Sequence, residues 1–66
     1  MGYETKQSLE VIREPERLRI TGLSRVQIWR MEKRGLFPKR VKLGENSVGW
    51  LRHELQSWIK AKAASR

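Results

Sequence analysis

The chain carries start and stop signals for one short helix in the stretch TGLSRVQIWRMEKRGLFP. Ser24 is a suitable N-cap, and Gln27 follows at the spacing that lets each side chain bond the other's backbone N–H in a capping box. At the far end, Gly35 suits the left-handed conformation that closes a helix, and Pro38 prevents the helix from resuming. These signals predict a helix over residues 25–34, around which any fold of this chain must be arranged.

The two sides of this predicted helix differ in chemistry. Ile28 and Met31 lie one turn apart, and with the flanking Leu23 and Leu36 they form an apolar inner side. The opposite side presents Arg25, Val26, Trp29, Arg30 and Lys33. A helix with fixed ends and a cationic outer side favours an anionic partner outside the protein.

The charge of the whole chain supports the same interpretation. Fifteen Lys and Arg oppose seven Asp and Glu in 66 residues, which gives a net charge of +8, and the sequence pI is about 10.9. Such a balance favours a polyanion, and nucleic acid is the first candidate. A chain of this length makes one domain with a small core. Because it has no Cys, neither disulfides nor a thiolate zinc site stabilises that core.

The residues before the capped helix predict a second, shorter helix over residues 15–21. Pro15 suits its first turn, where a missing N–H costs nothing, and Gly22 tolerates the backbone angles of the tight turn that follows. Residues 1–9 are polar without periodicity, which predicts a flexible tail. The alternative for its end is a short edge strand that includes Leu9, Val11 and Ile12.

The residues after the capped helix predict a hairpin and a final helix. Residues 41–43 and 47–50 are short runs separated by Gly44-Glu45-Asn46, which has suitable turn chemistry. Apolar residues then recur at the spacing of a helix that covers a core, in a stripe of Leu51, Leu55, Trp58 and Ile59. This helix should start at Leu51 and fade near Lys62, with residues 63–66 as a frayed end, and Trp50 should join its stripe in the core.

A short helix, a Gly-containing turn and a capped second helix form a helix-turn-helix, whose second helix enters the major groove of DNA. The predicted fold class is mainly α with a small β-hairpin, a winged helix-turn-helix domain over residues 10–62. The expected DNA-contacting residues are Ser24, Arg25, Val26, Gln27, Trp29, Arg30, Lys33, Lys39, Arg40, Lys42 and Asn46.

Each of these residues also has a plainer interpretation. Arg25 and Arg30 suit bidentate bonds to guanine or phosphate, or are solvated surface charges. Gln27 can read adenine, although the capping box already explains it. Trp29 contacts the DNA backbone in one interpretation and packs toward the first helix in the other. The cations at the helix end and before the wing either anchor phosphates or only solubilise the chain, namely Lys33, Arg34, Lys39, Arg40 and Lys42.

An enzyme is the least favoured class. The chain has one His, no Cys, no phosphate-cradling Gly loop and no pair of carboxylates in an apolar setting. His53 has no second His or Cys to share a metal with, so neither a metal nor another cofactor is expected. The N-terminus lacks the pattern of a signal peptide, and no apolar stretch approaches the roughly 20 residues that cross a bilayer. These features predict a cytoplasmic protein without membrane contact.

Several blocks within residues 12–59 occur in the order and spacing of a known family. They are TGLSR, the aromatic Trp29 followed by Arg30, GLFPKRVKLG, and VGW leading into a helix that contains Trp-Ile. In these blocks the chain resembles the AlpA family of prophage regulatory proteins, relatives of phage excisionases and of the DNA-binding heads of MerR regulators. The resemblance implies a MerR/excisionase-like winged helix-turn-helix that regulates transcription of prophage or genomic-island genes, often by activating a neighbouring integrase or excision gene.

Two positions depart from the family pattern. Glu45, Asn46 and Ser47 stand where relatives commonly place Arg in the wing turn, which argues against a basic wing tip that enters the minor groove. Arg17 stands where an apolar residue of the first helix is usual, which predicts a weaker core at that point. Neither departure falls in the second helix.

Double-stranded DNA is therefore the expected partner, together with self-association on adjacent sites and contact with RNA polymerase or an integrase. The chain is too short for the dimerising helix and effector domain of full MerR proteins, so no small-molecule ligand is expected. Two alternatives stay open. One is an architectural excisionase that bends attachment-site DNA, and the other is a protein-interaction module with only nonspecific affinity for DNA.

Overall fold

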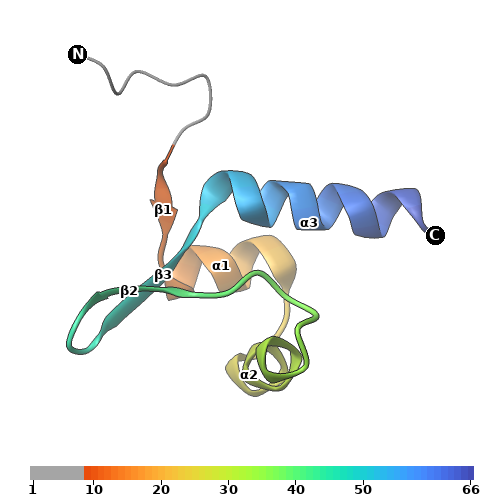
Figure 1. The fold of residues 1–66 in the computed structure, drawn as a ribbon. Coiled ribbons are helices and arrows are strands. Elements are labelled where there is room, and N and C mark those ends of the chain that lie inside the picture. The colour runs from red at the N-terminus through yellow and green to blue at the C-terminus, as the bar shows by residue number, and fades with distance from the viewer. Residues whose placement is uncertain (1–8) are drawn as a thin grey trace, which may run out of the picture.

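The computed structural model describes residues 9–66, so the predicted flexible tail lies outside the described residues except for Leu9. In chain order the elements are β1 (Val11–Ile12), α1 (Glu14–Thr21), α2 (Arg25–Lys33), β2 (Val41–Gly44), β3 (Ser47–Leu51) and α3 (Arg52–Ala64). Figure 1 shows the short helices α1 and α2, the β2–β3 hairpin extending away from them, and α3 running toward the C-terminus. The winged helix-turn-helix, mainly helical with a small antiparallel sheet, is confirmed.

The sheet has three strands in the order β1-β3-β2, with both pairings antiparallel. The edge strand that the sequence offers as an alternative is present at Val11 and Ile12, which pair with Leu51 and Trp50, but it does not include Leu9. At the wing, Gly44 pairs with Ser47, so the connecting turn is only Glu45-Asn46 and the predicted turn was one residue too long.

The start of the last helix differs from the sequence prediction. Leu51 is the final residue of β3 and the N-cap of α3, so the prediction that it begins the helix was wrong. Its backbone is extended because it still pairs with Val11 of β1. At the other end α3 runs to Ala64, past the point near Lys62 where the sequence predicts that it fades.

One glycine allows β1 to lie close to β3. Gly49 is buried, and a Cβ at this position would collide with the side chain of Val11 and lie 3.0 Å from the carbonyl oxygen of Ile12. Glycine normally destabilises the interior of a strand, and here the close approach of the β1 backbone explains why a glycine is present.

The core draws one buried side chain from most elements: Ile12, Ile28, Phe37, Trp50 and Leu55. Partly buried residues pack around these, namely Ile20, Leu23, Met31, Trp58 and Ile59. The predicted core positions of Trp50, Leu55, Trp58 and Ile59 are confirmed, whereas Ile12 and Phe37 were not expected there. Each fully buried aliphatic side chain contributes about 1.5–3 kcal/mol relative to its exposed state, which suits a small core with no disulfide.

Polar contacts join α3 to the rest of the domain at its start and near its middle. At its start Arg52 forms ion pairs with Glu10 at 2.9 Å and with Glu16 of α1 at 3.0 Å. The hydrogen bond to Glu16 is the largest cause that raises the pKa of Arg52 above its usual value. Farther along, Trp58 donates its indole N–H to the carbonyl of Leu36 at 2.8 Å and packs edge-on against Phe37. None of the helices within residues 9–66 has the length and apolar character needed to cross a membrane.

Candidate nucleic-acid interface

The N-terminus of α2 is fixed by its own sequence. Ser24 accepts a hydrogen bond from the backbone N–H of Gln27 at 3.1 Å, and the Gln27 side chain accepts one from the backbone N–H of Ser24 at 2.9 Å. The predicted capping box is therefore confirmed. It satisfies backbone donors that the first turn of a helix otherwise leaves unpaired.

The C-terminus of α2 is closed by a Schellman motif. Gly35 has a φ of +71° and donates its N–H to the carbonyl of Glu32 at 3.0 Å, while Leu36 donates to the carbonyl of Met31 at 2.8 Å. This bond pattern and the left-handed glycine define the motif. The helix ends at Lys33, one residue before the predicted end, because Arg34 takes the C-cap position. With both ends fixed, α2 presents one defined face to its surroundings.

The outer face of α2 is exposed as the sequence predicts. Ile28 points into the core, whereas the outward residues Arg25, Val26, Gln27, Trp29, Arg30 and Lys33 are all exposed. Val26 is 56% exposed and Trp29 52%, so Trp29 is not a buried core residue. The Lys33 ammonium lies 4.5 Å from the centroid of the Trp29 ring, a cation–π contact on the surface.

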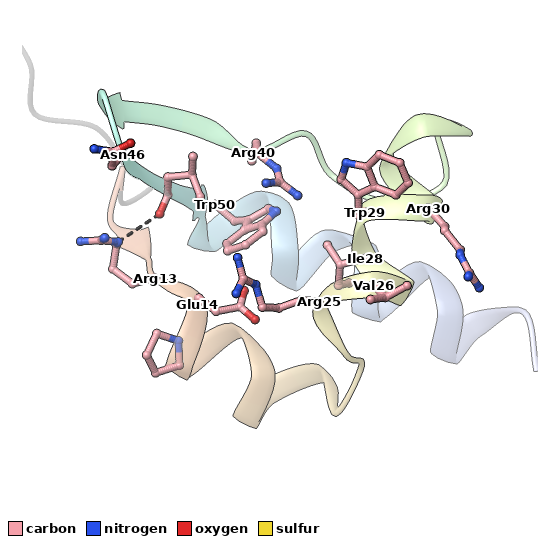
Figure 2. Close-up of a pocket in the computed structure, with 12 residues that line it drawn as sticks. Arg13, Glu14, Arg25, Val26, Ile28, Trp29, Arg30, Arg40, Asn46 and Trp50 are labelled. Atoms are coloured by element: carbon pink, nitrogen blue, oxygen red, sulfur yellow. Dashed lines mark hydrogen bonds between the residues drawn. The ribbon is translucent and has the colours of Figure 1, made fainter.

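A pocket of about 790 Å³ lies between three elements, the start of α1, the outer face of α2 and the β2–β3 hairpin (Figure 2). It collects six of the predicted DNA-contacting residues, which are Arg25, Val26, Trp29, Arg30, Arg40 and Asn46. The other five, Ser24, Gln27, Lys33, Lys39 and Lys42, are exposed but do not line it. The wing turn itself is formed by the exposed Glu45 and Asn46, so no cation stands at its tip.

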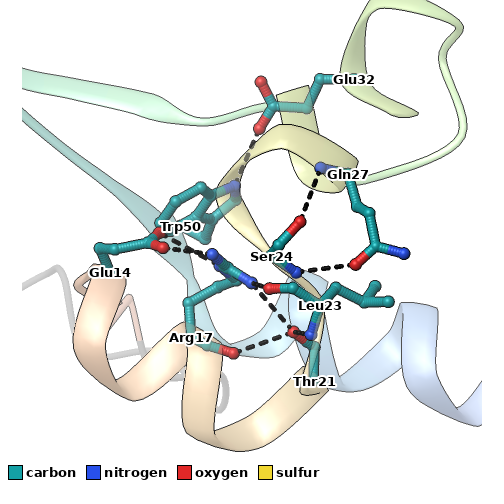
Figure 3. Close-up of polar contacts among 8 residues, drawn as sticks. All are labelled: Glu14, Arg17, Thr21, Leu23, Ser24, Gln27, Glu32 and Trp50. Atoms are coloured by element: carbon teal, nitrogen blue, oxygen red, sulfur yellow. Dashed lines mark hydrogen bonds and ion pairs between the residues drawn. The ribbon is translucent and has the colours of Figure 1, made fainter. Parts of the chain in front are cut away.

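A network around a buried arginine lies behind α2 (Figure 3). Arg17 of α1 has no exposed surface, and its guanidinium donates to the carboxylate of Glu14, to the hydroxyl of Thr21 at 3.1 Å and to the carbonyl of Leu23. It also lies 5.5 Å from the centroid of the Trp50 ring. At the predicted weak point in the core, each of the three guanidinium nitrogens therefore has a hydrogen-bond partner, and within residues 9–66 no buried side-chain N or O atom lacks one.

This network fixes the turn of the helix-turn-helix. Thr21 accepts from Arg17 and from the backbone N–H of Leu23 at 3.2 Å, and donates to the carbonyl of Arg17 at 3.0 Å. Gly22, with a φ of +71°, reverses the chain between Thr21 and Leu23, and its N–H donates to the carbonyl of Leu18 at 2.7 Å. Arg17 thus holds Leu23, the residue directly before the N-cap of α2.

A second network joins α2 to the wing. Glu32 of α2 accepts from Arg40 at 2.8 Å and from the indole N–H of Trp50 at 3.0 Å. The Glu32 side chain is 12% exposed, and the Arg40 guanidinium also lies 5.7 Å from the Trp50 ring. Arg40 was predicted to contact DNA phosphate, and the structure shows that part of its charge is already matched within the protein.

The arginines of residues 9–66 fall into two groups by their partners. Those that hold the scaffold form ion pairs, in the pairs Arg17–Glu14, Arg19–Glu16, Arg40–Glu32 and Arg52 with Glu10 and Glu16. By contrast Arg13, Arg25, Arg30, Arg34 and Arg66 form no ion pair with a carboxylate of this part of the chain, and the first three line the pocket. The pocket lining therefore carries an excess of positive charge.

Sequence reasoning missed Arg13 and the role of Glu32. Arg13 donates its Nε–H to the carbonyl of Val48 at 3.0 Å, across a separation of 35 residues, so no local pattern reveals that it reaches the wing. No role was assigned to Glu32 from the sequence alone. No group of His, Asp and Glu side chains in residues 9–66 is arranged to hold a metal ion.

Comparisons with known proteins bear on this surface. Residues 10–63 match the family described as the prophage CP4-57 regulatory protein (AlpA). The chain is also similar to the uncharacterised protein ORF88 of Enterobacteria phage P4, with 38% identity over 55 residues. The matched region covers 83% of this chain and 62% of the phage protein, so the chain spans less than two thirds of that relative's length.

We predict that Arg17→Lys lowers the free energy of unfolding by about 1–3 kcal/mol, measured by urea denaturation. Lysine keeps the charge but lacks the planar fork that reaches Glu14, Thr21 and Leu23 together. Arg19→Lys is the matched control on the same helix, because Arg19 is 73% exposed and its ion pair is worth about 0.5 kcal/mol or less. Equal effects of the two substitutions would contradict the network.

We also predict that Glu32→Gln has opposite effects on stability and on polyanion binding. Unfolding should become easier by about 1–2 kcal/mol, because Arg40 and Trp50 lose a charged acceptor. Retention on immobilised heparin should increase, because Arg40 then adds an unmatched charge. The control is Glu54→Gln, an exposed position on α3 with the same change in net charge. The prediction is wrong if both variants elute at the same salt concentration.

Proposed function

The chain belongs to the AlpA family of prophage regulatory proteins, and from this premise we propose that it is a sequence-specific, double-stranded DNA-binding regulator of prophage or genomic-island transcription. One observation carries the proposal. A short helix, fixed at both ends by local hydrogen bonds, exposes a face of arginines and apolar side chains beside a pocket whose lining carries an excess of positive charge.

The dimensions of α2 suit the major groove. Its nine residues extend about 14 Å at the rise of an α-helix, and the groove of B-DNA is about 12 Å wide. The first turn of a recognition helix meets base edges, which makes Arg25 and Val26 candidates for base contact. Arg30, one turn farther along the same exposed face, is the second candidate for a bidentate contact with guanine.

The capping box limits what Gln27 can do. Bidentate reading of adenine requires both the oxygen and the nitrogen of the side-chain amide. The oxygen of Gln27 already accepts from the backbone of Ser24, so this mode would open the N-cap of the helix. We therefore assign Gln27 and Ser24 mainly to the shape of the helix end, with the Gln27 amide nitrogen left to donate to DNA.

The remaining cations and the wing are assigned to the DNA backbone. Lys39 and Lys42 are exposed on the segment that leads into the hairpin, and Lys33 covers the Trp29 ring at the end of α2. Phosphate contacts of this kind position a protein on DNA but carry no sequence information. Asn46 at the wing turn is proposed to donate to the backbone through its amide.

The finer parts of the proposal concern what DNA binding achieves. Family membership favours control of an integrase or excision gene. One small reading helix gives limited specificity, and further copies on adjacent sites, or contact with RNA polymerase or an integrase, would increase it. A DNA partner also implies a cytoplasmic location. An excisionase would use the same surface to bend attachment-site DNA. Gel shifts with circularly permuted duplexes would then show a strong bend at that site, and the protein would not change transcription from a promoter.

We predict that Arg30→Ala weakens binding to a site selected from random duplexes by about 1–3 kcal/mol and relaxes the preference at one base pair. The control is Arg34→Ala, which removes an exposed arginine that lies at the C-cap and does not line the pocket. Its loss should weaken selected and unrelated duplexes alike. Unchanged selectivity of Arg30→Ala, measured by competition with unrelated DNA, would exclude α2 as the reading element.

We further predict that Val26 contacts the methyl group of a thymine. A 56% exposed valine on a cationic helix is a suitable partner for that methyl group, which uracil lacks. Replacing each thymine of the selected site by deoxyuridine should therefore weaken binding at one position by about 1 kcal/mol. Binding of the Val26→Ala variant should not weaken when deoxyuridine replaces thymine at that position. If no position responds while the selected site is still preferred, the valine does not read thymine.

A further inference from the structure

We propose that Arg13 holds a backbone phosphodiester of the bound duplex at the edge of the pocket between α1, α2 and the hairpin. This inference rests on the proposed DNA binding and extends it to a residue outside the reading helix and the wing. The ligand chemistry is a single monoanionic phosphate group. The source to which we commit is the duplex backbone, rather than free phosphate in solution.

The first argument is the orientation of Arg13. Its side chain is exposed, yet its Nε–H is bonded to the carbonyl of Val48 at 3.0 Å, as Figure 2 shows. This bond uses one donor of the guanidinium group and fixes its plane against strand β3. The donors of the two terminal nitrogens make no other hydrogen bond within residues 9–66. A planar fork held in this way binds phosphate with less loss of conformational entropy than an unrestrained side chain.

The second argument is the charge around the pocket. Its lining contains one carboxylate, Glu14, which is bonded to Arg17 behind the pocket, and Arg40 is matched by Glu32. Within residues 9–66, Arg13, Arg25 and Arg30 have no carboxylate partner. The lining therefore carries more positive than negative charge, which favours binding of an anion. Phosphate suits the site because guanidinium groups bond its oxygens in pairs.

The third argument concerns where the phosphate comes from. Val26, Trp29 and Arg30 belong both to the outer face of α2 and to the wall of the pocket, so the two surfaces are continuous. When a helix lies in the major groove, the sugar-phosphate backbones form the edges of that groove. The pocket lies on the side of α2 that faces the start of α1 and the hairpin, where one such backbone would pass.

The plainer explanation is that Arg13 only connects the start of α1 to the wing. The test therefore needs a measurement that a purely structural bond does not affect. A single methylphosphonate linkage removes the charge of one phosphate and leaves the bases unchanged. Placed at each backbone position of the selected duplex in turn, it locates every phosphate on which binding depends. The variant Arg13→Gln then shows which of these positions depends on Arg13.

With the full chain, we expect Arg13→Gln to bind the unmodified duplex about fivefold to tenfold more weakly. Its salt dependence, as the slope of log K against log salt concentration, should be shallower by about 0.9. At one linkage where methylphosphonate weakens the parent protein, the variant should show no further loss. Arg19→Gln is the matched control, because this exposed arginine of α1 does not line the pocket and should keep the parent's full response.

A second measurement uses the parent protein alone and so does not depend on whether the variant folds. The NMR signal of the Arg13 Nε–H should shift when the duplex is added and stay unchanged with inorganic phosphate at the same phosphate concentration. A shift that saturates with inorganic phosphate alone would overturn the duplex as the source. An unmoved signal, or an Arg13→Gln variant that responds to every linkage as the parent does, would overturn the phosphate contact.

Failure of this inference is distinguishable from failure of the proposed function. If the parent protein prefers its selected site but Arg13 responds to nothing, DNA reading stands and only the contact at Arg13 is lost. If the parent shows no preference among duplexes, the regulator proposal fails, and this inference fails with it.

Discussion

The buried guanidinium of Arg17 is the interaction on which the helix-turn-helix depends. It ties α1 to the turn through Thr21 and to the residue before the N-cap of α2 through the carbonyl of Leu23. A hydrophobic side chain at this position would fill space but would satisfy none of these groups. A buried ion pair gives little net stability compared with apolar packing, and its advantage lies in directional bonds. Here those bonds fix the angle at which α2 leaves the turn.

The tryptophan of β3 links this support to the wing. The guanidinium groups of Arg17 and Arg40 both lie against the Trp50 ring, and its indole N–H donates to Glu32 of α2. One aromatic side chain therefore contacts groups from α1, α2 and the hairpin in a core of only a few residues. The same contacts absorb the arginines nearest the core, so that the unmatched ones lie at the surface where an external anion can reach them.

Local signals in the sequence predicted the parts of the fold that local bonds determine. The capping box, the left-handed Gly35 and the two strands of the hairpin each lie within a few residues of their partners, and each is present. The β1 strand was predicted only as an alternative, because a two-residue strand forms only by pairing with a partner strand, which here lies some 40 residues away in the sequence. The resemblance to the family pattern predicted the architecture but did not reveal the hydrogen bonds that Arg17 makes.

The candidate site shows the same division. Its α2 residues follow from helical periodicity once both ends of the helix are known, and all of them are exposed where expected. Arg13 could not be found in this way, because its place in the pocket depends on a bond to Val48 across the molecule. Arg40 looked like one more surface cation, and only the tertiary structure reveals that Glu32 partly neutralises it.

The capped ends of α2 have a consequence for the evolution of such domains. The boundaries of α2 are set by Ser24 and Gln27 at its start and by Gly35 and Leu36 at its end, and Ile28 anchors it in the core. The exposed positions Arg25, Val26, Trp29 and Arg30 therefore contribute little to the stability of the fold. Substitutions there leave the scaffold intact. The residues proposed to contact DNA can therefore change while the architecture of the domain stays constant.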